Sequence, residues 1–237
     1  MANTQSNRKP VFRIVLFLIC AILIFLGLNT LYSFTNTLRQ LDVIESERDQ
    51  WQRPSDVLRA LDLREGNTVA DLGSGSGYFT LKLAPAVGKQ GQVLAVDLRK
   101  LSLFFLWTRA LLRGQHAVHV ILGEEDDPRL PTESVDAVLI CNTYHEFSHP
   151  EVILKRVGQA LRAGGRLVVA DRAPRLGDVE HGHGVPLSVV EGELQQSGFE
   201  IVGHDDHFID RHVDPQGDPQ TDDLWWLVIA RKPMRDR

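Results

Sequence analysis

Three glycines alternate in the segment Val69–Tyr78, which reads VADLGSGSGY. Because glycine has no Cβ, such a loop can turn sharply and bring its backbone amides close to a ligand. An apolar run typical of a buried strand precedes the loop, and a helical stretch follows it. The spacing is G-x-G-x-G rather than the G-x-G-x-x-G of dinucleotide sites, and Asp71, two residues before the first glycine, would repel a pyrophosphate. We therefore predict a ligand-binding loop that is not a dinucleotide fingerprint.

A carboxylate ends the next apolar run along the chain. Asp97 closes the segment Val93–Asp97 and lies 20 residues after Gly77. At the tip of the second strand of a nucleotide-binding sheet, a carboxylate can accept hydrogen bonds from both hydroxyls of a ribose. An isolated aspartate at a strand end is usually a solvated residue, but the glycine loop before it favours the ribose interpretation here.

Short apolar runs that alternate with helical stretches must position these residues. The predicted strands are Thr68–Leu72, Val93–Asp97, Ala117–Leu122, Val135–Cys141, Arg166–Asp171, Phe199–Ile209 and Leu224–Ala230. The predicted helices are Asp56–Leu63 (capped by Ser55), Tyr78–Val87, Lys100–Arg113, Pro150–Arg162 and Leu187–Ser197. Alternating strands and helices predict a doubly wound parallel sheet, and the last two strands, with no helix between them, are expected to pair antiparallel. The fold class is therefore α/β, with one domain over residues 54–237.

Composition and charge exclude several classes of protein. Of the 237 residues, 43% are apolar and 24% are charged, which is ordinary for a globular protein and not for a disordered one. The net charge of −5 provides no basic field that would attract nucleic acid. Two cysteines cannot form a disulfide framework, and the histidine spacings match no structural zinc signature. We therefore predict neither a nucleic-acid partner nor a metal site.

An apolar segment near the N-terminus is long enough to cross a bilayer. No charged residue occurs between Ile14 and Leu38, and about 20 apolar helical residues span the hydrocarbon core. A cleaved signal peptide is the alternative, but no small-x-small cleavage site follows the apolar stretch. We predict a basic tail (residues 1–13), a single transmembrane anchor (14–35) and a connecting helix (36–53).

Basic residues on both sides leave the orientation of this anchor open. Three precede it and three follow it: Arg8, Lys9 and Arg13, then Arg39, Arg48 and Arg53. Cytoplasmic flanks are enriched in Lys and Arg, and the second group is diluted by acids. The small bias favours a domain outside the cytoplasm, and the side of the membrane stays undecided.

The segment from Trp51 to Lys232 resembles the class I S-adenosylmethionine-dependent methyltransferases. VADLGSGSGYF is similar to their first motif and LAVD to the second; LGEEDDPRLPTESVDAVLICNTYHEF is similar to the third and fourth, and ALRAGGRLVVADR to the segment leading into the fifth strand. ERDQWQRP and NTYHEF also resemble a subgroup of predicted bacterial methyltransferases. The resemblance implies a Rossmann-like, seven-stranded sheet with an antiparallel C-terminal hairpin, and S-adenosylmethionine as cofactor.

The same resemblance implies roles for individual residues. Asp71 and the loop Gly73–Gly75 would hold the methionine part of the cofactor, Asp97 the ribose and Leu98 the adenine ring. The adenine amine would meet an acid in Glu124–Asp127, where Glu124 and Asp126 are our choices. The implied cofactor-binding set is Asp71, Gly73, Ser74, Gly75, Gly77, Tyr78, Asp97, Leu98, Glu124, Asp126 and Asn142.

Methyl transfer from a sulfonium requires two positioned reactants and, for a hydroxyl or amine acceptor, removal of a proton. Histidine is the usual base near neutral pH. His145, with Tyr144 beside it, follows the fourth predicted strand and is our candidate catalytic base. The alternative is that His145 is a structural or capping side chain. An acceptor that is already electron-rich, such as a carbanion or a thiolate, would need no base.

Residues outside the motifs are candidates for the walls of the site. In such folds the segment before the first strand often closes over the cofactor, so Trp51 and Gln52 are lid candidates. His181 and His183, between the fifth strand and the next helix, are candidate substrate contacts.

Two apolar clusters bear on packing. The helix predicted at Lys100–Arg113 is apolar on nearly all sides, although a surface helix needs one apolar face. We expect its excess apolar residues, Leu101–Trp107, to be buried against the N-terminal helix, with contact to a bilayer as the alternative. Trp225 and Trp226 are expected to pack on opposite faces of the sheet.

The sequence favours a membrane-tethered methyltransferase that acts on a small or lipophilic acceptor, because a tethered enzyme searches little volume. The glycine spacing and Asp71 disfavour a nicotinamide-dependent oxidoreductase. A membrane-anchored protein that binds S-adenosylmethionine or assists assembly without turnover is the other alternative. The charge bias around the anchor supports it, because that bias favours an exported domain whereas the cofactor is made in the cytosol.

Overall fold

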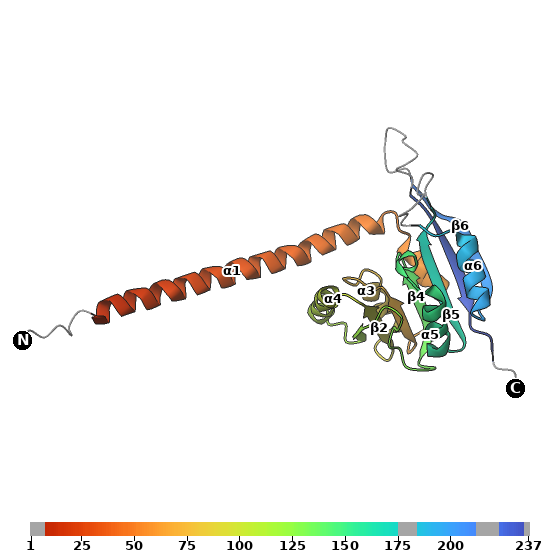
Figure 1. Cartoon of the computed structure of the whole chain (residues 1–237), viewed down its shortest axis with the longest axis horizontal. Coiled ribbons are helices and arrows are strands. Elements are labelled where there is room, and N and C mark those ends of the chain that lie inside the picture. Colours follow the sequence, from red (N-terminus) through yellow and green to blue (C-terminus); the bar gives the residue numbers. More distant parts are fainter. Residues whose placement is uncertain (1–7, 175–183, 212–222, 235–237) are drawn as a thin grey trace, which may run out of the picture. The chain divides into compact units, whose positions relative to one another are not determined.

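The computed structural model describes residues 8–174, 184–211 and 223–234 (Figure 1). The chain divides into two compact units, Met1–Ser46 and Glu47–Arg237. The second unit contains the sheet and every predicted site residue.

Helix α1 (Arg8–Asp49) has 42 residues and is long and apolar enough to cross a membrane. Its apolar side chains from Phe12 to Tyr32 are exposed. An anchor and a separate connecting helix were expected, but the structure has one continuous helix because no glycine or proline interrupts residues 28–49. That the helix spans a membrane stays a prediction.

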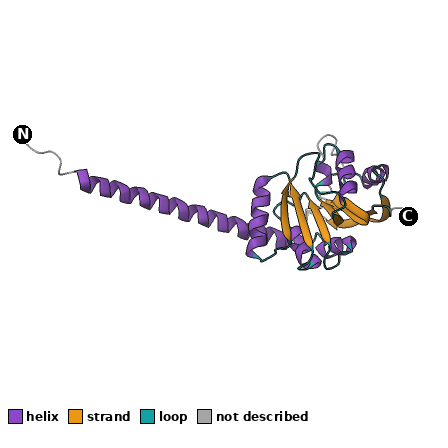
Figure 2. Cartoon of the chain, turned by 90° about the horizontal axis from the view of Figure 1, so that it is seen from below, coloured by secondary structure: helices purple, strands orange, loops and turns teal. Residues whose placement is uncertain are grey.

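Seven strands form one sheet in the order β3-β2-β1-β4-β5-β7-β6 (Figure 2). Their bounds are β1 (Thr68–Leu72), β2 (Gln92–Asp97), β3 (Val118–Leu122), β4 (Val135–Cys141), β5 (Leu161–Arg172), β6 (Glu200–Arg211) and β7 (Asp223–Arg231). Strands β1 to β5 pair in parallel, and β7 runs antiparallel to both β5 and β6. This arrangement confirms the predicted α/β, Rossmann-like fold with an antiparallel C-terminal hairpin.

Helices cover both faces of the sheet. They are α2 (Pro54–Leu61), α3 (Thr80–Val87), α4 (Lys100–Leu112), the 3-10 turn η1 (Tyr144–Glu146), α5 (Pro150–Ala160) and α6 (Leu187–Gln196). Successive side chains of a strand point to opposite faces, so Val96 of β2 packs in the core with α5 and α6 whereas Ala95 packs with α4. Trp226 and Trp225 divide in the same way and are both buried, which confirms their predicted packing.

Several element boundaries differ from the prediction, and two of these differences have a clear physical cause. Helix α2 begins at Pro54, because the fixed φ of proline suits the first helical position, and Arg53 before it has a left-handed φ of 50°. Ser55 therefore lies inside the helix and is not its cap. Strand β5 begins at Leu161, directly after α5, because Leu161 pairs with Val135 and extends the ladder toward the N-terminal edge of the sheet.

Helix α4 is packed on one side only. Leu103 and Leu106 are buried against the sheet and α3. Leu101, Phe104 and Trp107 are each about half exposed or more, so the other elements of the second unit do not bury them. Their expected burial against the N-terminal helix stays a prediction.

Candidate functional site

The glycine loop lies at the carboxyl end of β1, beside the end of β2. The backbone amides of Gly73 and Ser74 both donate to the carbonyl of Val96, at 2.9 and 3.0 Å. Gly73 has φ of 73°, and a Cβ there would lie 2.1 Å from Thr143 Oγ1, which explains why this position is a glycine. Gly75 has φ of 54° with no atom within 4 Å of a Cβ position, so its open side faces space that a ligand can use.

Asp97 joins this loop to the end of β2. Its side chain is buried, Oδ2 accepts a hydrogen bond from the Gly75 amide at 2.8 Å, and Oδ1 accepts one from the Arg99 amide at 2.8 Å. The Arg99 guanidinium also reaches Oδ1 at 3.2 Å from a largely exposed side chain. The predicted ribose ligand therefore also fixes the conformation of the glycine loop.

A cavity of about 150 Å³ opens beside Asp97 at the carboxyl edge of the sheet. Pockets for whole small-molecule ligands are typically about 300–1,000 Å³, so this one suits a part of a cofactor, such as a nucleoside. The lining residues are Leu72, Gly73, Val96, Asp97, Leu98, Arg99, Glu124, Glu125, Pro128, Thr143, Glu146, Phe147 and Ile153. The structure thus brings together four predicted residues, namely Gly73, Asp97, Leu98 and Glu124.

The cavity lining is acidic. Its charged residues are four carboxylates and one guanidinium: Asp97, Glu124, Glu125 and Glu146 against Arg99. Such a lining attracts a cation and repels a phosphate.

The acids after β3 divide between cavity and surface. Glu124 lines the cavity and forms an ion pair with Arg129. Asp126 lies outside the cavity lining and pairs with His149 Nδ1 at 3.0 Å, whereas its neighbour Glu125 lines the cavity. The acid opposite an adenine amine is therefore better sought in Glu124 and Glu125 than in Asp126.

Asp71 lies beneath the loop rather than in the cavity. It is buried, and its Oδ2 accepts a hydrogen bond from Thr80 Oγ1 at 2.5 Å, which ties the end of β1 to the start of α3. Burial raises the pKa of Asp71 to about 6, and the bond from Thr80 opposes that rise. The described contacts are therefore those of a residue that holds the loop in place.

Tyr78 connects the glycine loop to the segment before the domain. Its hydroxyl donates to Asp49 Oδ1 at 2.8 Å, and the Arg48 guanidinium lies 3.8 Å from its ring centroid. Lys82 Nζ, 4.4 Å from the same centroid, also pairs with Asp49 at 2.9 Å. The Tyr78 side chain is buried and does not line the cavity, so it supports the loop from behind.

The lid candidates pack over the carboxyl edge of the sheet. Gln52 is almost fully buried, accepts a hydrogen bond from Arg48 Nε at 2.7 Å and directs its amide nitrogen at Cys141 Sγ, 3.7 Å away at the end of β4. Trp51 meets Trp225 edge to face at 5.9 Å between ring centroids. Gln52 therefore lies against the end of β4 and Trp51 against β7, both at the carboxyl edge of the sheet.

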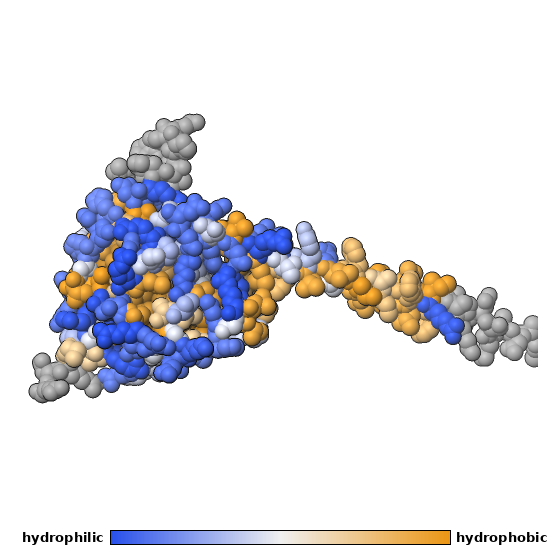
Figure 3. All heavy atoms as spheres, turned by 180° about the vertical axis from the view of Figure 1, so that it is seen from behind, coloured by the Kyte–Doolittle hydropathy of each residue, from blue (hydrophilic) through white to orange (hydrophobic). Residues whose placement is uncertain are grey.

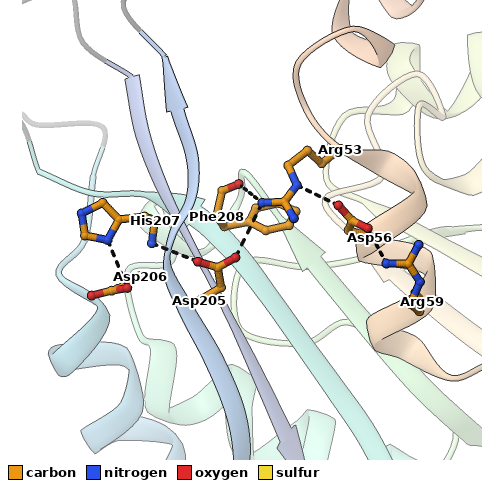
Figure 4. A network of polar contacts seen from close by, with 7 residues as sticks. All are labelled: Arg53, Asp56, Arg59, Asp205, Asp206, His207 and Phe208. Carbon is orange, nitrogen blue, oxygen red and sulfur yellow. Dashed lines mark hydrogen bonds and ion pairs between the residues drawn. The ribbon is translucent and has the colours of Figure 1, made fainter.

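A polar network holds the chain just after these residues (Figure 4). Arg53 donates to the carbonyl of Phe208 at 2.5 Å and pairs with Asp56 at 2.7 Å and with Asp205 at 3.6 Å. Arg59 pairs with the same Asp56 at 2.6 Å. The network joins the start of α2 to β6 and so fixes the segment that carries Trp51 and Gln52.

His145 faces β5 rather than the cavity. Its Nδ1 lies 2.8 Å from Asp171 Oδ1, and its backbone amide donates to Asp171 Oδ2 at 3.1 Å. Asp171 is fully buried and, as a carboxylate, only accepts, so Nδ1 of the ring carries the proton. The hydrogen bond to Asp171 raises the pKa of His145 above the ordinary histidine range. The pair has the geometry of a base held by a carboxylate.

Tyr144 turns the opposite way. Its ring is buried in the core, and its hydroxyl donates to Glu193 Oε2 of α6 at 2.5 Å. Burial raises the pKa of Tyr144, so its hydroxyl keeps its proton. This placement favours a structural role, and a catalytic role for Tyr144 stays a prediction without a supporting contact.

Two buried polar atoms near the loop lack a hydrogen-bond partner among the described residues: Ser74 Oγ and Asn142 Oδ1. Asn142 follows β4 with a left-handed φ of 56°. Buried polar atoms are nearly always paired, so both atoms are candidate contacts for a ligand.

Sequence reasoning missed several residues that the structure brings to the site. Asp171 is the second-last residue of β5 and Asp97 the last residue of β2, so a similar strand-tip signal was present. Thr143, Glu146 and Phe147 lie within the NTYHEF motif, but nothing in that motif shows which of its side chains face the cavity.

The remaining candidates lie elsewhere or outside the described residues. His181 and His183 fall in residues 175–183, which the structure does not describe. Within 8–174, 184–211 and 223–234, no group of three metal-ligating side chains is present.

A family model described as a methyltransferase domain matches residues 70–167. The match begins in β1 and ends in β5, and it includes the glycine loop, Asp97, the acids after β3 and His145. This part of the chain is a methyltransferase domain. The match confirms the methyltransferase family that the motifs predicted.

Relatives of the methyltransferase domain include two that are named for quinone biosynthesis. A ubiquinone/menaquinone biosynthesis C-methyltransferase (UbiE) of Ectopseudomonas mendocina (strain ymp) is 30% identical over 110 residues, which are 46% of this chain and 43% of that protein. A demethylmenaquinone methyltransferase of Geobacillus stearothermophilus is 28% identical over 116 residues, 49% of each chain. The chain thus spans less than half of the length of these relatives.

A solved structure supports the fold of the domain. The crystal structure of a SAM-dependent methyltransferase from Aquifex aeolicus matches with a TM-score of 0.65 at 23% identity, over 82% of this chain and 98% of that one.

Proposed function

We propose that this protein is a membrane-tethered methyltransferase that uses S-adenosylmethionine to methylate a small, lipophilic acceptor. The observation that carries the proposal is the buried carboxylate of Asp97, which lies between the glycine loop and an acidic cavity at the carboxyl edge of the sheet. The ribose of the cofactor would lie at this carboxylate.

The residues present fit this cofactor. A carboxylate offers about four lone-pair sites, and backbone amides occupy two on Asp97, so two remain for ribose hydroxyls once the exposed Arg99 side chain is displaced. The ammonium of the methionine part would supply donors for Ser74 Oγ and Asn142 Oδ1. The adenine would lie against Leu98, with its amine toward Glu124 or Glu125.

The charge of the cavity favours this cofactor over a dinucleotide. S-adenosylmethionine carries a sulfonium cation and no phosphate, whereas a nicotinamide dinucleotide carries a pyrophosphate. An excess of carboxylates in the lining attracts the former and repels the latter. The electrostatics therefore agree with the glycine spacing.

When bound, S-adenosylmethionine supplies an electrophilic methyl group. The chain supplies a base: Asp171 keeps the proton of His145 on Nδ1, so Nε2 is the basic nitrogen of the ring. Nε2 would take the proton of a phenolic or enolic hydroxyl, which makes the acceptor oxygen, or a carbon conjugated with it, nucleophilic. Asp171 would then stabilise the imidazolium and is a positioning residue.

Two features support a lipophilic acceptor delivered near a membrane. Relatives of the domain are named for ubiquinone and menaquinone biosynthesis, in which the methylated compounds are quinones. The chain also carries an apolar helix long enough to span a bilayer, which would hold the domain beside lipids. A tether raises the effective concentration of a membrane-dissolved acceptor.

The test uses the full chain in lipid nanodiscs. Calorimetry is expected to show binding of S-adenosylmethionine and of its demethylated product, and no binding of NAD. Methyl-labelled cofactor is then incubated with prenylated phenols, and label is expected in the organic extract. Binding without label transfer to any acceptor would favour the protein without turnover, and binding of NAD alone would overturn the proposal.

A further inference from the structure

Helix α4 presents an apolar face that the other elements of the second unit leave partly exposed. Its apolar side chains lie at positions that fall on one side of the helix, and Leu98, two residues before the helix begins, adds to them. Figure 3 shows apolar atoms exposed among hydrophilic ones on the surface of the second unit. The side chains of the apolar face are Leu98, Leu101, Phe104, Trp107, Leu111 and Leu112, each between 48% and 71% exposed. We call these six residues the α4 face. Soluble proteins rarely expose a contiguous apolar patch of this kind without a partner for it.

Basic residues lie at both ends of the α4 face. Arg99 and Lys100 stand at the start of the helix, and Arg113 follows its end. No acidic residue occurs from Leu98 to Gly123, although acids outnumber Lys and Arg by 31 to 26 in the whole chain. An apolar helix face flanked by cations matches the chemistry of a bilayer surface that contains anionic lipids.

The edge of the sheet extends this apolar surface. An open groove of about 420 Å³ lies between α4 and the edge strand β3, lined by Lys100, Leu103, Phe104, Trp107, Val120 and Leu122. Lys100 provides the only charge in that lining. A groove with an apolar floor and one cation suits an acyl chain with an anionic headgroup.

We propose that the α4 face docks on an anionic lipid bilayer. Phe104, Trp107 and Leu111 would enter the interfacial region, while Arg99, Lys100 and Arg113 would contact lipid headgroups. The inference rests on the membrane tether of the proposed function, but not on methyl transfer. It adds a second contact with the membrane, and since Leu98 and Arg99 also line the cofactor cavity, it would place one rim of that cavity at the lipid surface.

The test measures contact between lipid and single positions of the full chain in liposomes. Cys141 is buried and Cys20 lies on the apolar helix α1, so an environment-sensitive thiol label on the unmodified protein reports insertion of α1. In a Cys20→Ser background, Leu111→Cys places the label on the α4 face. Val189→Cys on α6 is the matched control, because it is a similarly exposed apolar position on the opposite face of the sheet.

Brominated lipids then report depth. We expect at least twofold quenching of the label at position 111 in liposomes with anionic lipid, less in purely zwitterionic liposomes, and none at position 189. Phe104→Glu with Trp107→Glu should abolish quenching at position 111, whereas Val189→Glu should not. All three residues are about half exposed and lie outside the buried core, so these changes leave the core intact.

Three results would overturn the inference. One is a label at position 111 that aqueous iodide quenches equally in all liposomes while the Cys20 label is buried in lipid. Another is a label protected from both bromine and iodide, which would mean that protein covers α4. The third is protection that rises with the ratio of protein to lipid, which would assign the face to a second copy. The label on Cys20 reports separately whether α1 inserts. If α1 did not insert, the membrane tether in the proposed function would be refuted.

Discussion

Replacing Asp97 by Asn is the sharpest test of the cofactor site. The side chain keeps its shape but loses its charge, and one of its two oxygens becomes an NH2 group. In the structure both oxygens accept backbone N–H groups, from Gly75 and from Arg99, each at 2.8 Å. The amide group would therefore face one of these N–H donors without an acceptor.

The magnitude follows from these contacts. A buried donor without a partner costs about 1–3 kcal/mol, and the loss of a charged acceptor for a ribose hydroxyl has a similar effect on binding. With about 1.4 kcal/mol for each tenfold change, the dissociation constant of S-adenosylmethionine should rise about 5- to 150-fold. The free energy of unfolding should fall by about 1–3 kcal/mol, because the loop contact is lost without ligand as well.

Calorimetric titration of the full chain measures the first quantity and urea unfolding the second. Asp126→Asn is the control, since Asp126 is an acid of the same region that lies outside the cavity and pairs with His149. The control should bind the cofactor as the unmodified protein does. If Asp97→Asn bound within twofold of the unmodified protein, the ribose assignment and the reasoning from the loop contact would both be refuted.

Three further substitutions test the remaining parts of the site. Gly73→Ala should lower the unfolding midpoint more than Gly75→Ala, because both changes strain a left-handed φ but only the Cβ at position 73 would collide with Thr143. Gly75→Ala should also weaken cofactor binding, because its Cβ would point into the open space beside the loop; equal losses of stability in the two variants would contradict this division. The rate of methyl transfer should fall as the pH falls through the raised pKa of His145. Asp171→Asn removes the hydrogen bond that raises this pKa, so the loss of rate should occur at lower pH in that variant. An unchanged dependence of the rate on pH would mean that His145 is not the base. The pKa of Asp71 is about 6 in the folded protein and about 3.9 when unfolded, so the folded state binds more protons between these values. Stability should therefore decline by about 3 kcal/mol in all as the pH rises from well below 4 to well above 6. Asp71→Asn should remove that decline, which unfolding curves at several pH values would show or disprove.

The strands and their tips were predictable because buried parallel strands leave a strong apolar signal. The glycine loop and Asp97 were predicted as a pair, and the structure joins them by the hydrogen bond from Gly75. Both features depend on short-range pattern and on the rule that parallel strands end at one edge of the sheet.

The directions of side chains after β4 were not predictable. A left-handed φ at Asn142 and the following 3-10 turn send Tyr144 toward Glu193 of α6 and His145 toward Asp171 of β5. These partners lie 49 and 26 residues away along the chain, so no local pattern contains them. For the same reason the sequence could not show that Glu125, rather than the predicted Asp126, lines the cavity. That distinction depends on the backbone conformation of the turn after β3.

The acidic lining of the cofactor cavity has a consequence for product release. The positive charge of S-adenosylmethionine lies on its sulfur and disappears when the methyl group leaves. The field of Asp97, Glu124, Glu125 and Glu146 therefore attracts the reactant and loses its hold on the neutral sulfur of the product. Transfer of the methyl group would itself loosen the spent cofactor, and this effect should fade as salt screens the cavity.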